Sequence, residues 1–171
     1  MNTLFRAFLA INATSWVVVV YGIKEEWTIT LLPSCVFSVI LLLAPIFLSW
    51  ISVWLTRFLS KDSLEDCAEL EDANNSFLPT YLAYFFVGLG IEKVQHLIFI
   101  YSIILAFTYV AHVRYFNPIF LLFGYRFYNA KTKAGTKIFI ISKTIFRNAN
   151  EVQFSDLRRI NDTTYISLSK K

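Results

Sequence analysis

The chain has 171 residues, of which 56% are hydrophobic and 18% aromatic, and its formal net charge is +4. A water-facing surface does not tolerate this much apolar and aromatic side chain in so small a protein, so an ordinary soluble domain is excluded. We therefore expect an α-helical polytopic membrane protein, with the bilayer as the solvent for the first two thirds of the chain.

Four apolar stretches predict four transmembrane helices, at about residues 5–23, 28–56, 76–91 and 94–113. The uncharged part of the first stretch, residues 7–23, is just long enough to cross a hydrocarbon core of roughly 30 Å. A cleaved signal peptide is the alternative for this stretch, but no cleavage site with small residues follows it. The second stretch is longer than the core is thick, so it must tilt or kink, and Pro45 is the natural kink.

The third and fourth stretches predict a helical hairpin. The third begins after Asn74-Asn75-Ser76, residue types that favour helix N-caps, and it is too short to be a typical span by itself. The fourth follows at once after the turn Glu92-Lys93, which sets the two helices side by side and antiparallel.

The distribution of basic residues predicts the orientation. The connections at residues 24–26 and 92–93 hold one Lys each, whereas residues 114–171 hold eleven Lys and Arg against three Asp and Glu. Because Lys and Arg concentrate in cytoplasmic segments, we expect both termini in the cytoplasm.

The loop between the second and third helices, residues 57–75, is acidic. Its centre, residues 62–72, carries six acidic residues and no basic one. A solvated helical or disordered connector explains such a run. The alternative is an acidic docking surface for a basic partner, which includes the protein's own basic tail.

A short apolar segment at residues 117–124 follows the last predicted helix. It is too short to span a membrane and too apolar to lie in water, so we expect it at the inner membrane interface or against the helices. The short third helix favours association between copies. We therefore expect a homo-oligomer whose interface includes Ile119, Leu122 and Gly124.

Residues 125–171 predict a small, basic, β-rich cytoplasmic domain after a transmembrane region at 1–124. Alternating β-branched and aromatic residues predict strands, and Lys133-Ala134-Gly135 predicts a turn. The expected elements are strands at 126–130, 136–142, 151–154 and 163–168, with one helical turn at 155–160. So small a domain is marginal alone, so we expect it to pack on the helices or on another subunit.

The basic residues of this tail are candidates for binding a cytoplasmic partner. The leading candidates are Arg126, Lys131, Lys133, Arg158 and Arg159. The simpler alternative is contact with anionic lipids of the inner leaflet, which attract Lys and Arg by about 1 kcal/mol each.

No catalytic motif, cofactor site or metal site is predicted, and we expect no enzyme. Cys35 and Cys67 lie on opposite sides of a membrane boundary, so they are poor disulfide partners and are expected to be free. His96 and His112 are about 24 Å apart along one helix and cannot share a metal ion.

The segment Asn117 to Tyr128 and the pair Thr80-Tyr81 carry a resemblance to a known family. Asn117-Pro118 is followed by apolar residues and Gly124-Tyr125, and the chain resembles the membrane subunit of the Kiwa anti-phage defence system. The resemblance implies four spans, a small β-rich cytoplasmic end and a bacterial inner-membrane location. It also implies a response to phage and assembly with a soluble DNA-binding partner, through which any contact with nucleic acid is indirect.

A small oligomeric channel or pore is the alternative function. A pore must line water with polar side chains. The candidates are weak, and they are Asn12, Thr14 and Ser15 in the first helix with Ser34, Ser38 and Ser49 in the second.

Overall fold

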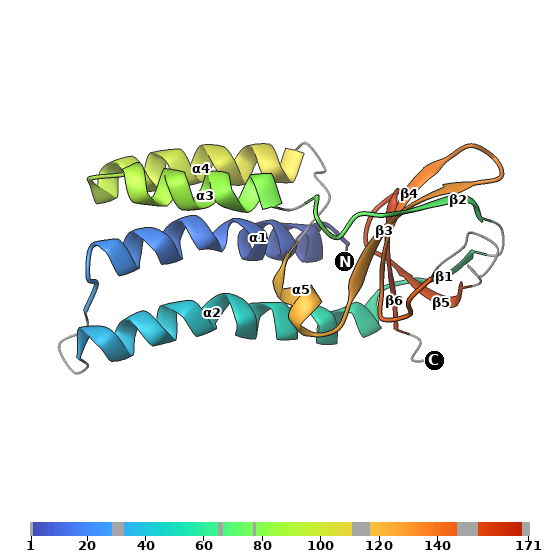
Figure 1. The fold of residues 1–171 in the computed structure, drawn as a ribbon, viewed down its shortest axis with the longest axis horizontal. Coiled ribbons are helices and arrows are strands. Elements are labelled where there is room, and N and C mark those ends of the chain that lie inside the picture. The colour runs from blue at the N-terminus through green and yellow to red at the C-terminus, as the bar shows by residue number, and fades with distance from the viewer. Residues whose placement is uncertain are drawn as a thin grey trace. The chain divides into compact units, whose positions relative to one another are not determined.

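The computed structural model describes residues 2–28, 33–64, 67–76, 78–110, 117–146 and 154–168. The chain forms two compact units, drawn in Figure 1. We call Ala7–Ile51 with Phe77–Asn117 the helical unit. We call Met1–Arg6, Ser52–Ser76 and Pro118–Lys171 the sheet unit.

Four helices lie where the apolar stretches predict them. They are α1 (Asn2–Lys24), α2 (Ser34–Leu55), α3 (Leu78–Gly90) and α4 (Val94–Val110). Of the described helices, α1 and α2 are long and apolar enough to cross a membrane, whereas α3 and α4 are shorter. The last predicted residues of the fourth helix, 111–113, lie outside the described part of the chain.

The core of the helical unit forms around α1. Val17 and Tyr21 of α1 pack with Ile91 and Leu97. Gly88 of α3 permits this close packing, because a Cβ atom there would lie 2.9 Å from the Cβ atom of Val20. Small residues of this kind let helix backbones approach each other in membrane proteins.

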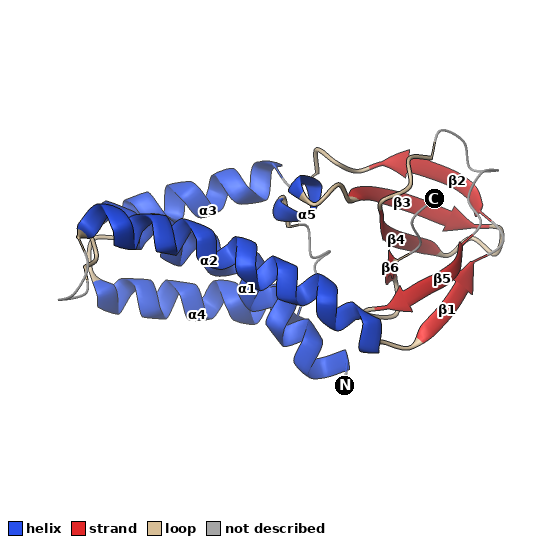
Figure 2. Cartoon of the chain, turned by 90° about the horizontal axis from the view of Figure 1, so that it is seen from below, coloured by secondary structure: helices blue, strands red, loops and turns tan. Residues whose placement is uncertain are grey.

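The sheet unit contains six strands, which Figure 2 shows in red. Their order is β1-β5-β6-β4-β3-β2, in which β4 and β6 are parallel and the other neighbours are antiparallel. The strands are β1 (Lys61–Leu64), β2 (Cys67–Asp72), β3 (Arg126–Thr132), β4 (Lys137–Ser142), β5 (Phe154–Arg159) and β6 (Thr164–Ser167).

Chain connectivity forces this sheet to curl. The two edge strands, β1 and β2, are consecutive in sequence, and only two residues separate Leu64 from Cys67. Three peptide steps cover at most about 11 Å, whereas the edges of a flat six-stranded sheet lie about 24 Å apart. The sheet must therefore bend until these edges approach each other, which gives it an inner and an outer face.

Each face of the sheet has its own core. The inner face buries Tyr128 and Ala130 of β3 with Ile138, Ile140 and Leu157. On the outer face, the ring of Phe127 stacks on Phe139 with centroids 5.8 Å apart. Alternation along β3 and β4 places successive residues on opposite faces, so both faces of these central strands are apolar.

A short helix, α5 (Ile119–Leu122), covers part of the outer face. Phe120 is buried and its ring lies 6.5 Å from that of Phe127. The apolar segment 117–124 therefore packs on the sheet through Phe120, a partner that the sequence analysis did not name.

Two secondary-structure predictions are wrong. Residues 57–75 were expected to form a helical or disordered connector, but they form a 3-10 turn, η1 (Thr56–Phe58), and the edge strands β1 and β2. Residues 155–160 were expected to form a helical turn, but β5 occupies Phe154–Arg159. The hairpin at 126–142 and the last strand are confirmed, whereas residues 151–153 lie outside the described residues.

Candidate functional site

The five basic residues predicted to bind a partner all lie in the sheet unit, but they do not form one surface. Arg126 and Lys131 are both on β3 at positions of opposite parity, so their side chains leave opposite faces of the sheet. Arg158 and Arg159 are adjacent on β5 and diverge in the same way. Lys133 is exposed in the turn between β3 and β4.

Lys131, Arg158 and Arg159 are bonded to partners within the unit. Lys131 Nζ lies 2.9 Å from Glu69 Oε1, and Arg159 lies 2.6 Å from Asp162 Oδ1. The Arg158 side chain is only 13% exposed and donates a hydrogen bond to the carbonyl oxygen of Leu59. Arg126 and Lys133 are the members of the set whose side chains are most open to solvent.

The pairing of β2 with β3 confirms that the acidic loop docks on the protein's own basic tail. Cα partners run from Cys67 opposite Thr132 to Asp72 opposite Tyr128. The Lys131–Glu69 ion pair crosses this strand pair. The opposite charges of the two segments are therefore partly neutralised inside one unit, which leaves fewer basic residues for a partner.

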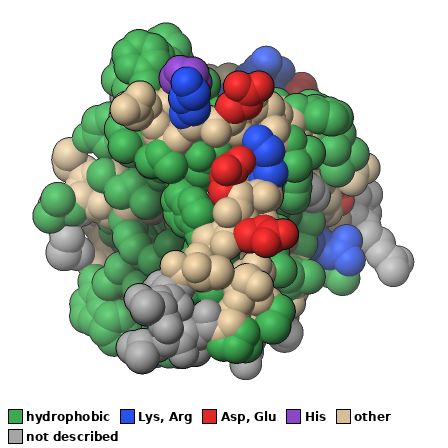
Figure 3. Space-filling view, turned by 90° about the vertical axis from the view of Figure 1, so that its left-hand side faces the viewer, with side chains coloured by type: hydrophobic (Ala, Val, Ile, Leu, Met, Phe, Trp, Pro, Cys, Tyr) green, Lys and Arg blue, Asp and Glu red, His purple; other side chains and the backbone are tan. Residues whose placement is uncertain are grey.

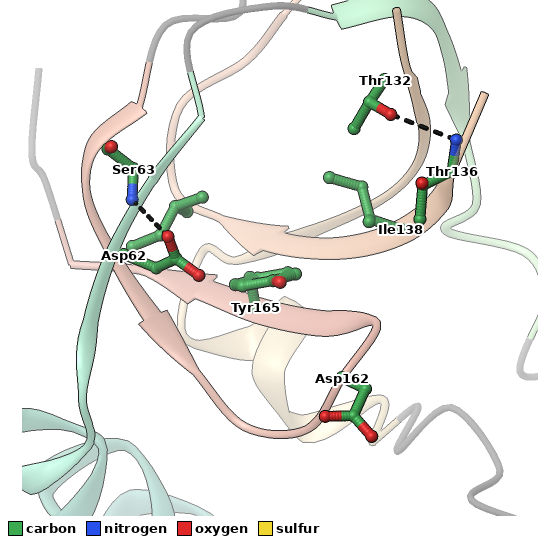
Figure 4. Close-up of a pocket in the computed structure, with 8 residues that line it drawn as sticks. Asp62, Ser63, Thr132, Thr136, Ile138, Asp162 and Tyr165 are labelled. Carbon is green, nitrogen blue, oxygen red and sulfur yellow. Dashed lines mark hydrogen bonds between the residues drawn. The ribbon is translucent and has the colours of Figure 1, made fainter. Parts of the chain in front are cut away.

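A half-open cavity of about 200 Å³ lies on the inner face of the curled sheet (Figure 4). Asp62 and Asp162 supply two carboxylates, and Tyr165 lies between them in the view. Ile138 and Leu157 supply apolar lining. Asp62 and Asp162 are far apart in the sequence and belong to different segments, so no local pattern predicts that they share a cavity.

Two ionisable side chains in and near this cavity have raised pKa values. Burial raises the pKa of Tyr165, and the charges of Asp62 and Asp162 raise it further, against an opposing effect of Arg159. Burial also raises the pKa of the Cys67 thiol in the inner core, so this thiol stays protonated at neutral pH. Within the described residues, no three His, Cys, Asp or Glu side chains lie close enough to hold a metal ion.

The three residues predicted at an oligomer interface differ in accessibility. Ile119 is buried within its own unit, whereas Leu122 and Gly124 are exposed. Gly124 has φ of +78°, a conformation that suits glycine, and no atom lies within 4 Å of where its Cβ would be. Of the two large side chains, Leu122 is therefore the one available to a second copy.

A buried polar cluster links α1, α2 and Asn117 within the helical unit. The side-chain amide groups of Asn12 and Asn117 both donate to Ser49 Oγ, over 2.9 and 2.8 Å. Ser49 Oγ in turn donates to the carbonyl oxygen of Pro45 over 2.7 Å. A hydroxyl has one proton and two lone pairs, so these three bonds use the full capacity of Ser49. Asn12 and Ser49, considered above as pore-lining residues, are thus bonded to each other.

Charged side chains gather at the end of the helical unit that Figure 3 faces. The α1 terminus and the α3–α4 turn meet there, because Lys24 Nζ donates to the carbonyl oxygen of Ile91 over 2.7 Å. Lys24 also lies 3.3 Å from Glu25. His96 is exposed near the start of α4, Cys35 is exposed, and His112 lies outside the described residues.

Comparison with known proteins identifies one family. The family model described as anti-phage protein KwaA matches residues 5–166, a stretch that runs from α1 into β6. Searches of curated proteins and of solved structures found no match. The family expected from the segment Asn117 to Tyr128 is thereby confirmed.

Proposed function

Because the chain belongs to the KwaA family of anti-phage proteins, we propose that it is a four-span inner-membrane scaffold whose sheet unit recruits a soluble DNA-binding partner in the cytoplasm. In this proposal the protein is not an enzyme and works as a homo-oligomer. Contact with nucleic acid is made by the partner.

The observation that carries this proposal is which segments of the chain supply the strands of the sheet. Strands β1 and β2 come from the loop before α3, and they pair with β5 and β3 from the tail after α4. Two segments that pair in one sheet lie on the same side of any membrane that the helices cross. In the chain, α3 and α4 lie between these two segments. If α3 crosses the membrane, α4 must cross back to the same side, which supports an antiparallel hairpin of spans.

The outward faces of the short helices support the same arrangement. Phe86 of α3 is 70% exposed and Phe107 of α4 is 71% exposed. Further exposed apolar side chains follow on both helices, namely Leu82 and Leu89 on α3 with Ile98, Phe99 and Val110 on α4. Apolar faces this extensive favour contact with lipid or with another membrane helix rather than with water.

Reporter fusions test the topology. Alkaline phosphatase, which is active outside the cytoplasm, is expected to be active when fused at Glu25 or Lys93 and silent when fused at Lys171. Activity at Lys171 contradicts the proposal, because it requires an odd number of spans.

Charge reversal tests recruitment of the partner. Arg126→Glu with Lys133→Glu changes two exposed cations, and we expect weaker co-purification of the soluble protein encoded beside this gene. The salt dependence of recovery is also expected to fall, because exposed charge pairs are screened by salt. The matched control is Lys93→Glu, an exposed lysine in the α3–α4 turn. Unchanged recovery at two salt concentrations contradicts an electrostatic docking surface.

The channel remains the alternative, and the polar cluster weighs against it. Asn12 and Ser49 are buried and bonded within one copy, so they are not available to line a water-filled path in that arrangement. Ion flux from vesicles that contain the purified protein, above that of empty vesicles, would favour the channel over the scaffold.

A further inference from the structure

Two aromatic side chains are exposed where α2 runs into the sheet unit. Trp54 is 48% exposed and Phe58 is 56% exposed. Their rings contact edge to face, with centroids 5.2 Å apart. Thr56 and Leu59, which flank this turn, are buried. The buried side chains of Thr56 and Leu59 therefore hold the turn in place, while the rings of Trp54 and Phe58 stay on the surface.

Two basic residues lie around Tyr125 in the same unit. Lys143 Nζ is 4.8 Å from the centroid of the Tyr125 ring. Burial raises the pKa of Tyr125, and the positive charge of Arg57 opposes that effect, so Arg57 also acts electrostatically on this phenol. Arg57 is adjacent to Phe58 in η1, so the cations and the exposed rings belong to one region.

These cations differ from three others of the sheet unit. Lys131, Arg158 and Arg159 each have an acidic partner within 4 Å. In the described part of the chain, Arg57 and Lys143 are exposed and have no acidic partner. Two cations without an acidic partner and two exposed aromatic rings favour a ligand that is anionic and also borders an apolar phase.

We propose that the surface formed by Trp54, Arg57, Phe58 and Lys143, with the buried ring of Tyr125 beneath Lys143, binds the headgroups of anionic phospholipids. The guanidinium and ammonium groups donate to lipid phosphate, and the aromatic rings occupy the interfacial layer, where Trp is enriched. The inference rests on the proposed membrane location. A soluble anion would use the cations but not the rings, whereas a lipid uses both.

The continuity of this surface with α2 favours a membrane lipid as the ligand. Phe47 and Trp50, two turns and one turn before Trp54, are also exposed, and their rings stack with centroids 6.1 Å apart. The exposed aromatic row thus runs along the helix and ends at Phe58, where Arg57 supplies charge. An apolar row that ends in aromatic and basic residues is the pattern expected where a helix leaves the hydrocarbon core.

Quenching of Trp54 by brominated lipids tests the proposal. The full-length protein is reconstituted into phosphatidylcholine vesicles that contain equal amounts of either brominated phosphatidylglycerol or brominated phosphatidylcholine. The Trp54→Phe protein supplies the background from the other tryptophans. We expect the anionic lipid to be preferred by about fivefold or more, and the preference to disappear in Arg57→Gln/Lys143→Gln.

Two further variants separate charge from folding. Arg57→Lys/Lys143→Arg keeps both charges and is expected to keep the preference. Lys131→Gln removes a cation that is already paired and is expected to leave the preference unchanged. Equal quenching by the two lipids overturns the proposal, and so does a preference that survives in the double Gln variant.

Failure of the membrane location itself gives a different result. The protein would then be released from cell membranes by alkaline carbonate, and neither brominated lipid would quench Trp54. Firm membrane retention combined with equal quenching by both lipids overturns only the headgroup site.

Discussion

The two units contain similar kinds of large apolar residues but place them in opposite ways. In the sheet unit, Phe127, Phe139 and Ile140 are buried, and charged residues occupy the edge strands. In the helical unit, Phe86 and Phe107 point outward, and Asn12 and Ser49 are buried. Polar groups inside and apolar groups outside suit a lipid solvent, whereas the reverse suits water. The difference supports the proposal that the helical unit lies in the membrane and the sheet unit in water.

The largest effect is expected from a cavity in the sheet unit. Phe127→Ala removes a fully buried ring that stacks on Phe139, and such substitutions reduce the free energy of unfolding by about 3–5 kcal/mol. Limited proteolysis of the purified protein in detergent, at increasing urea, measures the loss. The control is Phe107→Ala on the exposed face of α4, which is expected to change stability little. Equal losses for the two variants would contradict the contrast between the units.

A smaller effect is expected from overpacking in the helical unit. Gly88→Ile places a side chain where even a Cβ atom would lie 3.0 Å from the backbone oxygen of Val17, so α1 and α3 must separate. Overpacking of this kind reduces stability by about 1–3 kcal/mol. Thermal unfolding in detergent measures it. Gly90→Ile is the matched control, because no atom lies within 4 Å of a Cβ at that glycine. If Gly90→Ile lowers the stability equally, the close approach of α1 and α3 at Gly88 does not explain the loss.

The polar cluster of the helical unit is expected to contribute less. Ser49→Ala removes the acceptor that Asn12 and Asn117 share, and hydrogen bonds between helices in membranes are worth about 1 kcal/mol. Ser102→Ala is the control, because that exposed hydroxyl bonds only within its own helix, to the Ile98 carbonyl oxygen. A lower melting temperature for Ser49→Ala alone supports the cluster, and equal melting temperatures argue against it.

The smallest effect is expected at the surface of the sheet unit. Lys131 and Glu69 form an ion pair with exposed side chains, so solvent screens their attraction. A double-mutant cycle of Lys131→Ala and Glu69→Ala is expected to give a coupling of about 0.2–1 kcal/mol that declines with salt. The absence of any measurable coupling would mean that β2 is held to β3 by backbone pairing without help from charge.

Local patterns were sufficient to predict the helices and one hairpin. Long apolar stretches predict α1 to α4 because helix formation in an apolar solvent depends on composition over a contiguous segment. Alternating aromatic and β-branched residues predict β3 and β4, and Gly135, at φ of +85°, supplies the turn between them. The family resemblance also came from a contiguous segment, Asn117 to Tyr128.

The strands β1, β2 and β5, which local patterns did not predict, depend on pairing between segments far apart in the chain. Residues 61–72 carry mostly charged and polar side chains because β1 and β2 are edge strands, and an edge strand with exposed charges looks like a solvated loop. Leu157 in β5 and Ile160 directly after it have the spacing of a helical turn, but pairing with β1 and β6 imposes the strand.

The candidate sites depend on this pairing. Composition identifies the basic residues as a group, but only the tertiary structure shows that Lys131 and Arg159 are already bonded to acidic residues. The shared cavity of Asp62 and Asp162 arises from segments far apart in the chain, whereas the β3–β4 hairpin brings Lys143 next to Tyr125. The sequence by itself determined which segments are apolar, charged or strand-forming, because these are properties of neighbouring residues. The tertiary structure decided which charges are neutralised and which stay available, because that depends on the partners that the curled sheet brings together.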